Sequence, residues 1–195
     1  KFMDWMTNVF APKMNKIARN PWVAAVQESI LTAMPVILIG SFATVFNILR
    51  DFIPQIPDIS MISNFSFGLL ALFLAYLIPA TIMEKKKHRK TAKQAGMAGL
   101  AFFLMIVYPS FDDAGNINIL FSNLGTGGMI ASLIAGLFVG AVMNQFAKHS
   151  FFGEDSSLPD FITVWFDTLI PITLILIIGW LFTFVWEIRI FNIIY

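Results

Sequence analysis

Five long apolar segments divide the chain, and they constrain its fold more than any other feature. They are residues 22–49, 62–83, 92–109, 124–147 and 159–186. About 20 apolar residues are needed to cross a hydrocarbon core of about 30 Å. Charged residues make up only 13% of the sequence, well below the roughly 25% of an ordinary soluble domain. The sequence therefore predicts an all-α polytopic membrane protein, with about five transmembrane helices in one membrane domain over residues 1–195.

The residues before the first apolar segment have the pattern of an amphipathic helix. The apolar set is Phe2, Met6, Val9 and Phe10, and the polar set is Asp4, Thr7 and Asn8. Trp5 is placed where an aromatic ring would lie at headgroup level. We expect an amino-terminal interfacial helix that lies in the membrane surface; the alternative is a simple extension of the first span.

Positive charge is confined to alternate loops. One side would hold the amino-terminal segment and the loops after the second and fourth spans. That side carries all of the 13 Lys and Arg residues except Arg50 and Arg189. The opposite loops carry Asp51, Asp58, Asp112 and Asp113. By the positive-inside rule, the amino terminus is predicted to be cytoplasmic.

The densest positive cluster is EKKKHRK, residues 84–90, between the second and third spans. Its location predicts a short cytoplasmic turn that is held inside by its charge and by contact with anionic lipid. A nucleic-acid-binding patch is the competing interpretation. Membrane insertion of both flanks explains the same residues, so we expect the lipid bilayer as a partner and no nucleic acid.

The sequence offers no self-contained active site. It has no Cys and only two isolated His residues, His88 and His149, and their spacing does not supply the carboxylates that a metal site would need. It also has no phosphate-cradling glycine loop, nucleophile elbow or carboxylate pair. We therefore predict no catalytic residue, no metal and no cofactor, and we assign no substrate-binding residue.

Small residues recur at every fourth position of the fourth span. They are Gly128, Ser132, Gly136 and Gly140. This spacing places them on one face of a helix, where they allow the backbone of another helix to approach closely. The partner is either another helix of the same chain or a second copy of the protein.

Two acidic residues are candidate intramembrane polar sites, because an ionisable group in hydrocarbon is costly and is usually functional. Asp167 lies about 12 Å along a helix that starts at Pro159, and Glu28 lies near the start of the first span. Both positions are also compatible with the membrane–water interface.

Two stretches resemble a known family. SILTAMPVILIGSF, with Pro35, Gly40 and Ser41, resembles the first-span signature of the membrane IIC components of the bacterial phosphoenolpyruvate-dependent sugar phosphotransferase system, in the lactose/cellobiose branch. LPDFITVWFDTLIP resembles a later signature of that family. The matching positions there include Pro159, Phe166, Leu169 and Pro171.

The resemblance implies a permease in the bacterial cell membrane that takes up an oligosaccharide, such as a disaccharide, coupled to its phosphorylation. The implied partners are the sugar, a cytosolic IIB phosphocarrier and a second copy in a homodimer. Members of the family are about twice as long, and the residues credited with sugar contact and phosphoryl transfer lie in their second half. The resemblance therefore assigns the signature residues of this chain to the scaffold and assigns no catalytic residue. It does not identify the sugar.

The chain also departs from the family pattern. The family usually has a proline where Asp160 stands, a small residue where Asp167 stands and a different lead-in before Pro159. These departures favour an alternative, a half-length IIC-like scaffold or regulatory protein without transport activity. An unrelated five-span channel or transporter is a third alternative.

Overall fold

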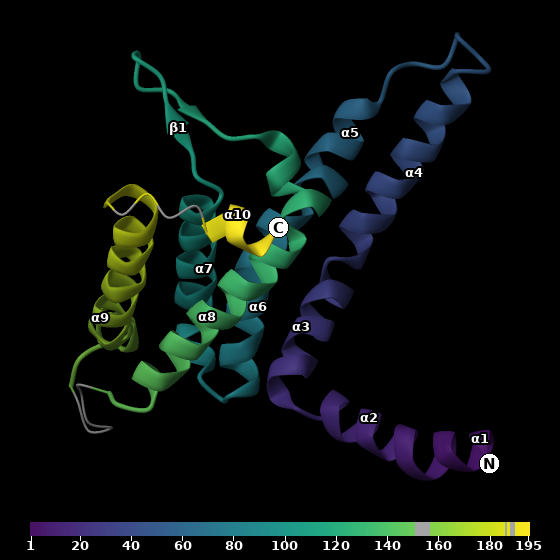
Figure 1. Ribbon diagram of the computed structural model, residues 1–195. Coiled ribbons are helices and arrows are strands. Elements are labelled where there is room, and N and C mark those ends of the chain that lie inside the picture. The colour runs from purple at the N-terminus through teal and green to yellow at the C-terminus, as the bar shows by residue number, and fades with distance from the viewer. Residues whose placement is uncertain (151–156, 186, 188–189) are drawn as a thin grey trace.

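A computed structural model describes residues 1–150, 157–185, 187 and 190–195, and nearly all the regular structure in them is helical (Figure 1). The amino-terminal helices are α1 (Phe2–Trp5), the π-helix η1 (Met6–Phe10), α2 (Ala11–Ala18), α3 (Pro21–Thr32) and α4 (Met34–Arg50). The central elements are α5 (Ser60–Phe65), the 3₁₀-helix η2 (Phe67–Leu69), α6 (Leu70–Lys85), η3 (Arg89–Thr91) and α7 (Ala92–Ile106). A two-strand hairpin, β1 (Ser110–Phe111) and β2 (Ile117–Asn118), precedes η4 (Phe121–Leu124), η5 (Thr126–Gly128) and α8 (Met129–Ala147). The last elements are α9 (Asp160–Trp180), the π-helix η6 (Leu181–Val185) and α10 (Ile190–Ile194).

The predicted all-α membrane class is confirmed. Within the described residues, three helical stretches are long and apolar enough to cross a membrane: Ser60–Lys85, Thr126–Ala147 and Asp160–Val185. The pair α3 and α4 gives a fourth if it is one bent span. The predicted segment 92–109 contains only the 15-residue helix α7, about 22 Å long. The helix ends at Ile106, and Tyr108 has a φ of 56°. The following Pro109 disfavours helical backbone in the residue before it, so the helix does not continue.

The first apolar segment is divided by a bend of 46° between α3 and α4. α3 begins where the Asn20 side chain accepts a hydrogen bond from the Trp22 amide at 3.0 Å, with Pro21 in the first turn; both are typical of helix starts. The bend follows from Pro35 in the first turn of α4, because proline has no amide hydrogen to continue the hydrogen bonds of the preceding helix.

α6 is the central helix of the bundle. It packs against α3, α7 and α8, and the side chains of Leu74, Ile78 and Ile82 are fully buried. α9 lies on the outside of α7 and α8 (Figure 1). The buried core therefore lies along α6, α7 and α8, while α9 and α4 expose large apolar side chains, as helices facing lipid do.

Helix α4 diverges from the rest of the bundle (Figure 1) and contacts it through α5 and η2. Only Gly40 and Ala43 of α4 are buried. Gly40 allows this contact, because a β-carbon there would overlap the Phe67 side chain of η2. The exposed apolar residues of α4 include Leu38, Phe42 and Val45.

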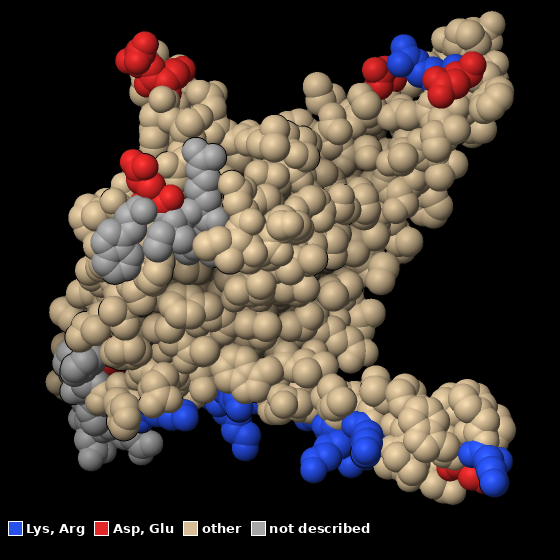
Figure 2. Space-filling model, in the orientation of Figure 1, with Lys and Arg blue, Asp and Glu red and all other residues tan. Residues whose placement is uncertain are grey.

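The two ends of the bundle differ in charge. Lys and Arg side chains gather along the end that holds α2 and the α6–α7 turn, which we call the basic end (Figure 2). Asp and Glu gather at the opposite, acidic end, at the tips of the α4–α5 loop and of the hairpin (Figure 2). At the acidic end Arg50 pairs with Asp58 at 3.3 Å. Arg189 lies outside the described residues.

Two carboxyl groups at the acidic end organise their own loops. The Asp112 side chain accepts hydrogen bonds from the Asn116 side chain at 2.8 Å and from the Asn116 amide at 2.7 Å. These bonds lower the pKa of Asp112. The pKa of Asp58 is lowered chiefly by the hydrogen bond from the Ser60 amide. Both of these carboxyl groups are therefore ionised at neutral pH.

The carboxyl-terminal helix α10 folds back onto α8. The Tyr195 hydroxyl oxygen accepts a hydrogen bond from the Ile130 amide at 3.1 Å. This amide belongs to the first turn of α8, where backbone N–H groups have no partner within their own helix. Tyr195 thus caps α8 from a distance of 65 positions in the sequence.

Candidate functional site

A cavity of about 760 Å³ opens at the basic end. It lies between the α6–α7 turn, the end of α8 and the first turns of α9. Its charged lining residues are Lys87, Arg89, Lys90, Glu84, Asp160 and Asp167. His88 and His149 also line it. We call this the basic-end cavity.

The α6–α7 turn is held in place by hydrogen bonds that close the end of α6. The His88 amide donates to the Met83 carbonyl at 2.8 Å, and the Lys87 amide donates to the Glu84 carbonyl at 3.0 Å. Lys87 itself has a φ of 66°. This is the Schellman arrangement, in which glycine usually occupies the left-handed position. A lysine in that position is strained, so the wall of the cavity is built at some cost in stability.

Opposite charges meet across the cavity. The Lys90 ammonium lies 3.6 Å from the Asp160 carboxylate and ties the turn to the start of α9. Both side chains are mostly exposed, so this pair adds little stability. The Asp167 carboxylate accepts a hydrogen bond from the Ser150 hydroxyl at 2.8 Å. The cavity thus presents cations on the turn and carboxylates on α9, an arrangement suited to a charged or strongly polar partner.

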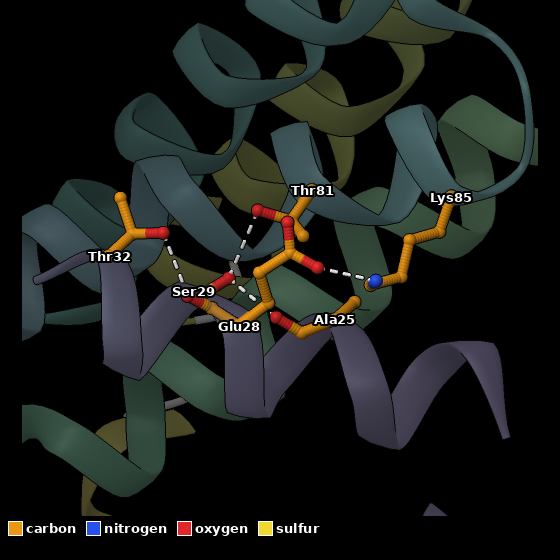
Figure 3. Close-up of polar contacts among 6 residues, drawn as sticks. All are labelled: Ala25, Glu28, Ser29, Thr32, Thr81 and Lys85. Atoms are coloured by element: carbon orange, nitrogen blue, oxygen red, sulfur yellow. Dashed lines mark hydrogen bonds and ion pairs between the residues drawn. The ribbon is translucent and has the colours of Figure 1, made fainter. Parts of the chain in front are cut away.

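Asp167, predicted as a candidate intramembrane residue, lines this cavity at the basic end. Glu28, the other candidate, lies elsewhere. Its carboxylate pairs with the Lys85 ammonium at the contact between α3 and α6 (Figure 3). The structure therefore does not bring the two acidic residues into one site.

The Glu28–Lys85 pair belongs to a polar joint that fastens α3 to α6 (Figure 3). Within it the buried Ser29 hydroxyl donates to the Ala25 carbonyl at 2.7 Å, and its oxygen lies 3.2 Å from the Thr81 hydroxyl oxygen. Nearby, the Lys86 ammonium lies 5.3 Å from the ring centre of Trp22, within the range of a cation–π contact. These contacts hold α3 against α6, whereas the polar contacts of α4 are to α5 and the residue before it: the Thr44 and Ser63 hydroxyl oxygens lie 2.9 Å apart, and the Ile59 amide donates to the Asn47 side chain at 3.3 Å.

The small-residue stripe of α8 faces α6 of the same chain. A β-carbon on Gly136 would lie 2.8 Å from the Ile78 β-carbon, and one on Gly140 would lie 2.5 Å from Ile82. Ser132 is fully buried, and its hydroxyl donates to the Met129 carbonyl at 2.8 Å. Gly128 is buried just before α8 begins, with the Asn123 carbonyl against it. The stripe therefore lets α6 and α8 approach closely.

The residues of the two scaffold signatures lie in different surroundings. Pro35 begins α4 after the bend, Gly40 is buried against η2, and Ser41 is exposed. In the second signature Pro159 precedes the first turn of α9, and Pro171 is buried inside that helix. Phe166 and Leu169 are 51% and 59% exposed. The segment 151–156, which belongs to the unusual lead-in, lies outside the described residues.

Sequence patterns did not reveal several residues that shape the basic end. The Lys90–Asp160 pair and the Ser29–Thr81 bond join residues far apart in the sequence. The strained Lys87 lacks the usual glycine signal of its turn. In the part of the chain that the structure describes, no group of three His, Asp or Glu side chains could hold a metal ion.

Comparisons with known proteins agree with this architecture. Residues 27–194 match the family model of the phosphotransferase system, EIIC. The fold is similar to the crystal structure of the transporter ChbC, the IIC component of an N,N'-diacetylchitobiose-specific phosphotransferase system. The TM-score is 0.73 at 17% sequence identity, covering 94% of this chain and 47% of that one. The chain thus spans about half the length of ChbC. No curated protein matches the sequence significantly.

Proposed function

Because this chain belongs to the EIIC family of the phosphotransferase system, we propose that it forms part of a sugar permease. The permease takes up a disaccharide-type sugar coupled to its phosphorylation, and these residues supply its scaffold and subunit interface. The observation that carries the proposal is the family match over residues 27–194. The fold likeness to ChbC, which serves a disaccharide-specific system, supports it.

In this proposal the protein lies in the bacterial cell membrane with its amino terminus in the cytoplasm. The distribution of Lys and Arg supports this orientation, since these residues gather at the basic end (Figure 2), whereas Arg50 is the only one of those described that lies at the acidic end. The positive-inside rule places the richer Lys and Arg end in the cytoplasm. The basic-end cavity then opens toward the cytosol.

A cytosolic IIB phosphocarrier is the proposed partner of that face. Such a carrier presents a negatively charged phosphoryl group, and the α6–α7 turn presents Lys87, Arg89 and Lys90 beside the basic-end cavity. Cations arranged around a hollow favour the approach of an anionic partner. We assign this cavity to docking of the carrier.

The protein is also proposed to form a homodimer. Gly136 and Gly140 already contact α6, so a second copy would need another surface. The exposed apolar side of α4, with Leu38, Phe42 and Val45, is the surface that we propose. Because α4 stands away from its own bundle (Figure 1), a neighbouring subunit can reach it.

The permease proposal is tested by uptake. The chain is produced together with the second half of an EIIC permease and a IIB protein, in bacteria that lack their own disaccharide permeases. Phosphorylated sugar inside the cells is then measured for a panel of disaccharides. We expect phosphorylated sugar only when all three components are present, because transport and phosphorylation are coupled. Cells without IIB are the control.

A second candidate is a IIC-like scaffold or regulatory protein that does not transport. Asp160 and Asp167 favour it, because they line the basic-end cavity at positions where the family pattern has other residue types. If the chain inserts into the membrane and no pairing yields phosphorylated sugar, the permease proposal fails and the scaffold is favoured.

A further inference from the structure

The segment 1–19, which we call the arm, is a helix with no core of its own. It comprises α1, η1 and α2 and leaves α3 crosswise (Figure 1). Every residue of the arm is exposed. Among these are large apolar side chains such as Phe2, which is 71% exposed, and Ile17, which is 53% exposed. A helix of this composition is stable only when another phase covers its apolar side.

A π-helical turn in the middle of the arm decides which side is apolar. In a continuous α-helix, residues five apart point in clearly different directions. Here the rings of Trp5 and Phe10 lie 5.6 Å apart, because η1 between them has the wider turn of a π-helix. Five such residues rotate the rest of the helix by about a quarter turn.

This rotation gathers the apolar residues into a narrower stripe. Before η1 the stripe contains Phe2 and Trp5, whose rings stack at 6.4 Å. From Phe10, the last residue of η1, it continues through Met14 and Ile17. Without the rotation, Trp5 would share its side of the helix with Lys16. With the rotation, Lys16 leaves the centre of the stripe for its polar border.

The basic side chains of the arm begin at one border of the stripe and step from it toward the polar side of the helix. These are Lys13, Lys16 and Arg19, which follow one another at three-residue intervals. Close to the root of the arm, Lys86 lies over the ring of Trp22. Figure 2 shows Lys and Arg gathered beneath the junction of the arm with the bundle. The arm thus carries a row of positive charge beside a stripe of apolar side chains.

We infer that the arm docks onto the surface of an anionic phospholipid bilayer, with the π turn η1 setting the register of the two faces. The apolar stripe enters the acyl boundary, and Lys13, Lys16 and Arg19 contact acidic headgroups. The charge complementarity and the continuity of the arm with the first membrane segment favour a lipid surface over a protein partner. This inference concerns membrane attachment and holds whether or not the protein transports sugar.

The test uses spin labels on the whole chain, which is convenient because the sequence has no Cys. Single cysteines replace Trp5, Asn8, Phe10, Met14 or Asn15, and the protein is placed in nanodiscs of phosphatidylglycerol or of phosphatidylcholine. Accessibility to oxygen and to a water-soluble nickel complex gives the depth of each label. In phosphatidylglycerol we expect labels at positions 5, 10 and 14 in the lipid and labels at 8 and 15 in water.

The double variant Lys13→Gln/Lys16→Gln tests whether docking of the arm depends on its charge. Each lost charge is expected to weaken binding of the arm to an anionic surface roughly fivefold. The matched control Lys93→Gln/Lys148→Gln removes two exposed charges of the basic end outside the arm. We expect the arm labels to become shallower only in the first variant. Equal depth in both lipids overturns the anionic-lipid inference. If the labels at positions 5 and 10 lie on opposite sides of the helix, the register that η1 sets is wrong. If every label is exposed to water, the arm does not dock on the bilayer.

Discussion

Lys87 shows how a single residue sets the shape of the basic-end cavity. Its φ of 66° is available to glycine without strain but costs other residues about 1 kcal/mol. The turn keeps this conformation because the His88 and Lys87 amides both bond to the end of α6. A cation therefore lines the cavity at a position where the backbone conformation favours glycine.

We predict that Lys87→Gly leaves the fold intact and raises the stability of the turn by up to about 1 kcal/mol. Lys86→Gly removes the same charge one position earlier, where φ is −84°, and it should destabilise the protein because it also loses the contact with Trp22. Thermal unfolding in detergent compares the two variants. If Lys87→Gly is the more destabilising of the two, the left-handed strain at position 87 is refuted.

At the scale of helices, the contact between α6 and α8 depends on the absence of side chains. Gly136 and Gly140 lie against Ile78 and Ile82, and a β-branched isoleucine has little freedom to move aside. In a membrane this kind of close approach supplies much of the attraction between helices.

We predict that Gly136→Leu lowers the apparent melting temperature in detergent, since overpacking costs about 1–3 kcal/mol. Ala141→Leu is the matched control, because Ala141 is an exposed residue of the same helix. It should leave the melting temperature unchanged. The dimer fraction of both variants is measured alongside. A stable Gly136→Leu protein that loses only its dimer would instead assign the stripe to the subunit contact.

At the scale of the whole molecule, the apolar pattern and the order of the helices could be predicted from the sequence. The spacing of Gly128, Ser132, Gly136 and Gly140 indicated a packing face, and Gly136 and Gly140 lie against α6. The third span was predicted as the shortest, but the end of α7 at Ile106, before the predicted residue 109, was missed although Pro109 is a local signal. Joints such as Ser29–Thr81 and the Tyr195 cap of α8 were missed because no local pattern encodes contacts over more than fifty residues.

The orientation of the whole molecule gives the broadest prediction. Single cysteines at positions 87 and 113 are labelled in intact cells with a reagent that does not cross membranes. We expect Asp113→Cys to react from outside and Lys87→Cys to react only after the membrane is opened, because positive charge is retained in the cytoplasm. The reverse pattern would invert the proposed topology and direct the basic-end cavity away from the cytosol.

The 46° bend after α3 has a consequence for the surrounding bilayer. Beside it lies an apolar hollow of about 430 Å³, lined by Ala33 and Val36 at the bend, by Leu72 and Tyr76 of α6 and by Leu100 of α7. Lipid tails do not leave empty space beside a protein, so an acyl chain or a neighbouring helix must fill this recess. A straight helix would displace the acyl chain or helix in this recess. Pro35, which causes the bend, therefore determines the neighbours of the protein in the bilayer as well as its own shape.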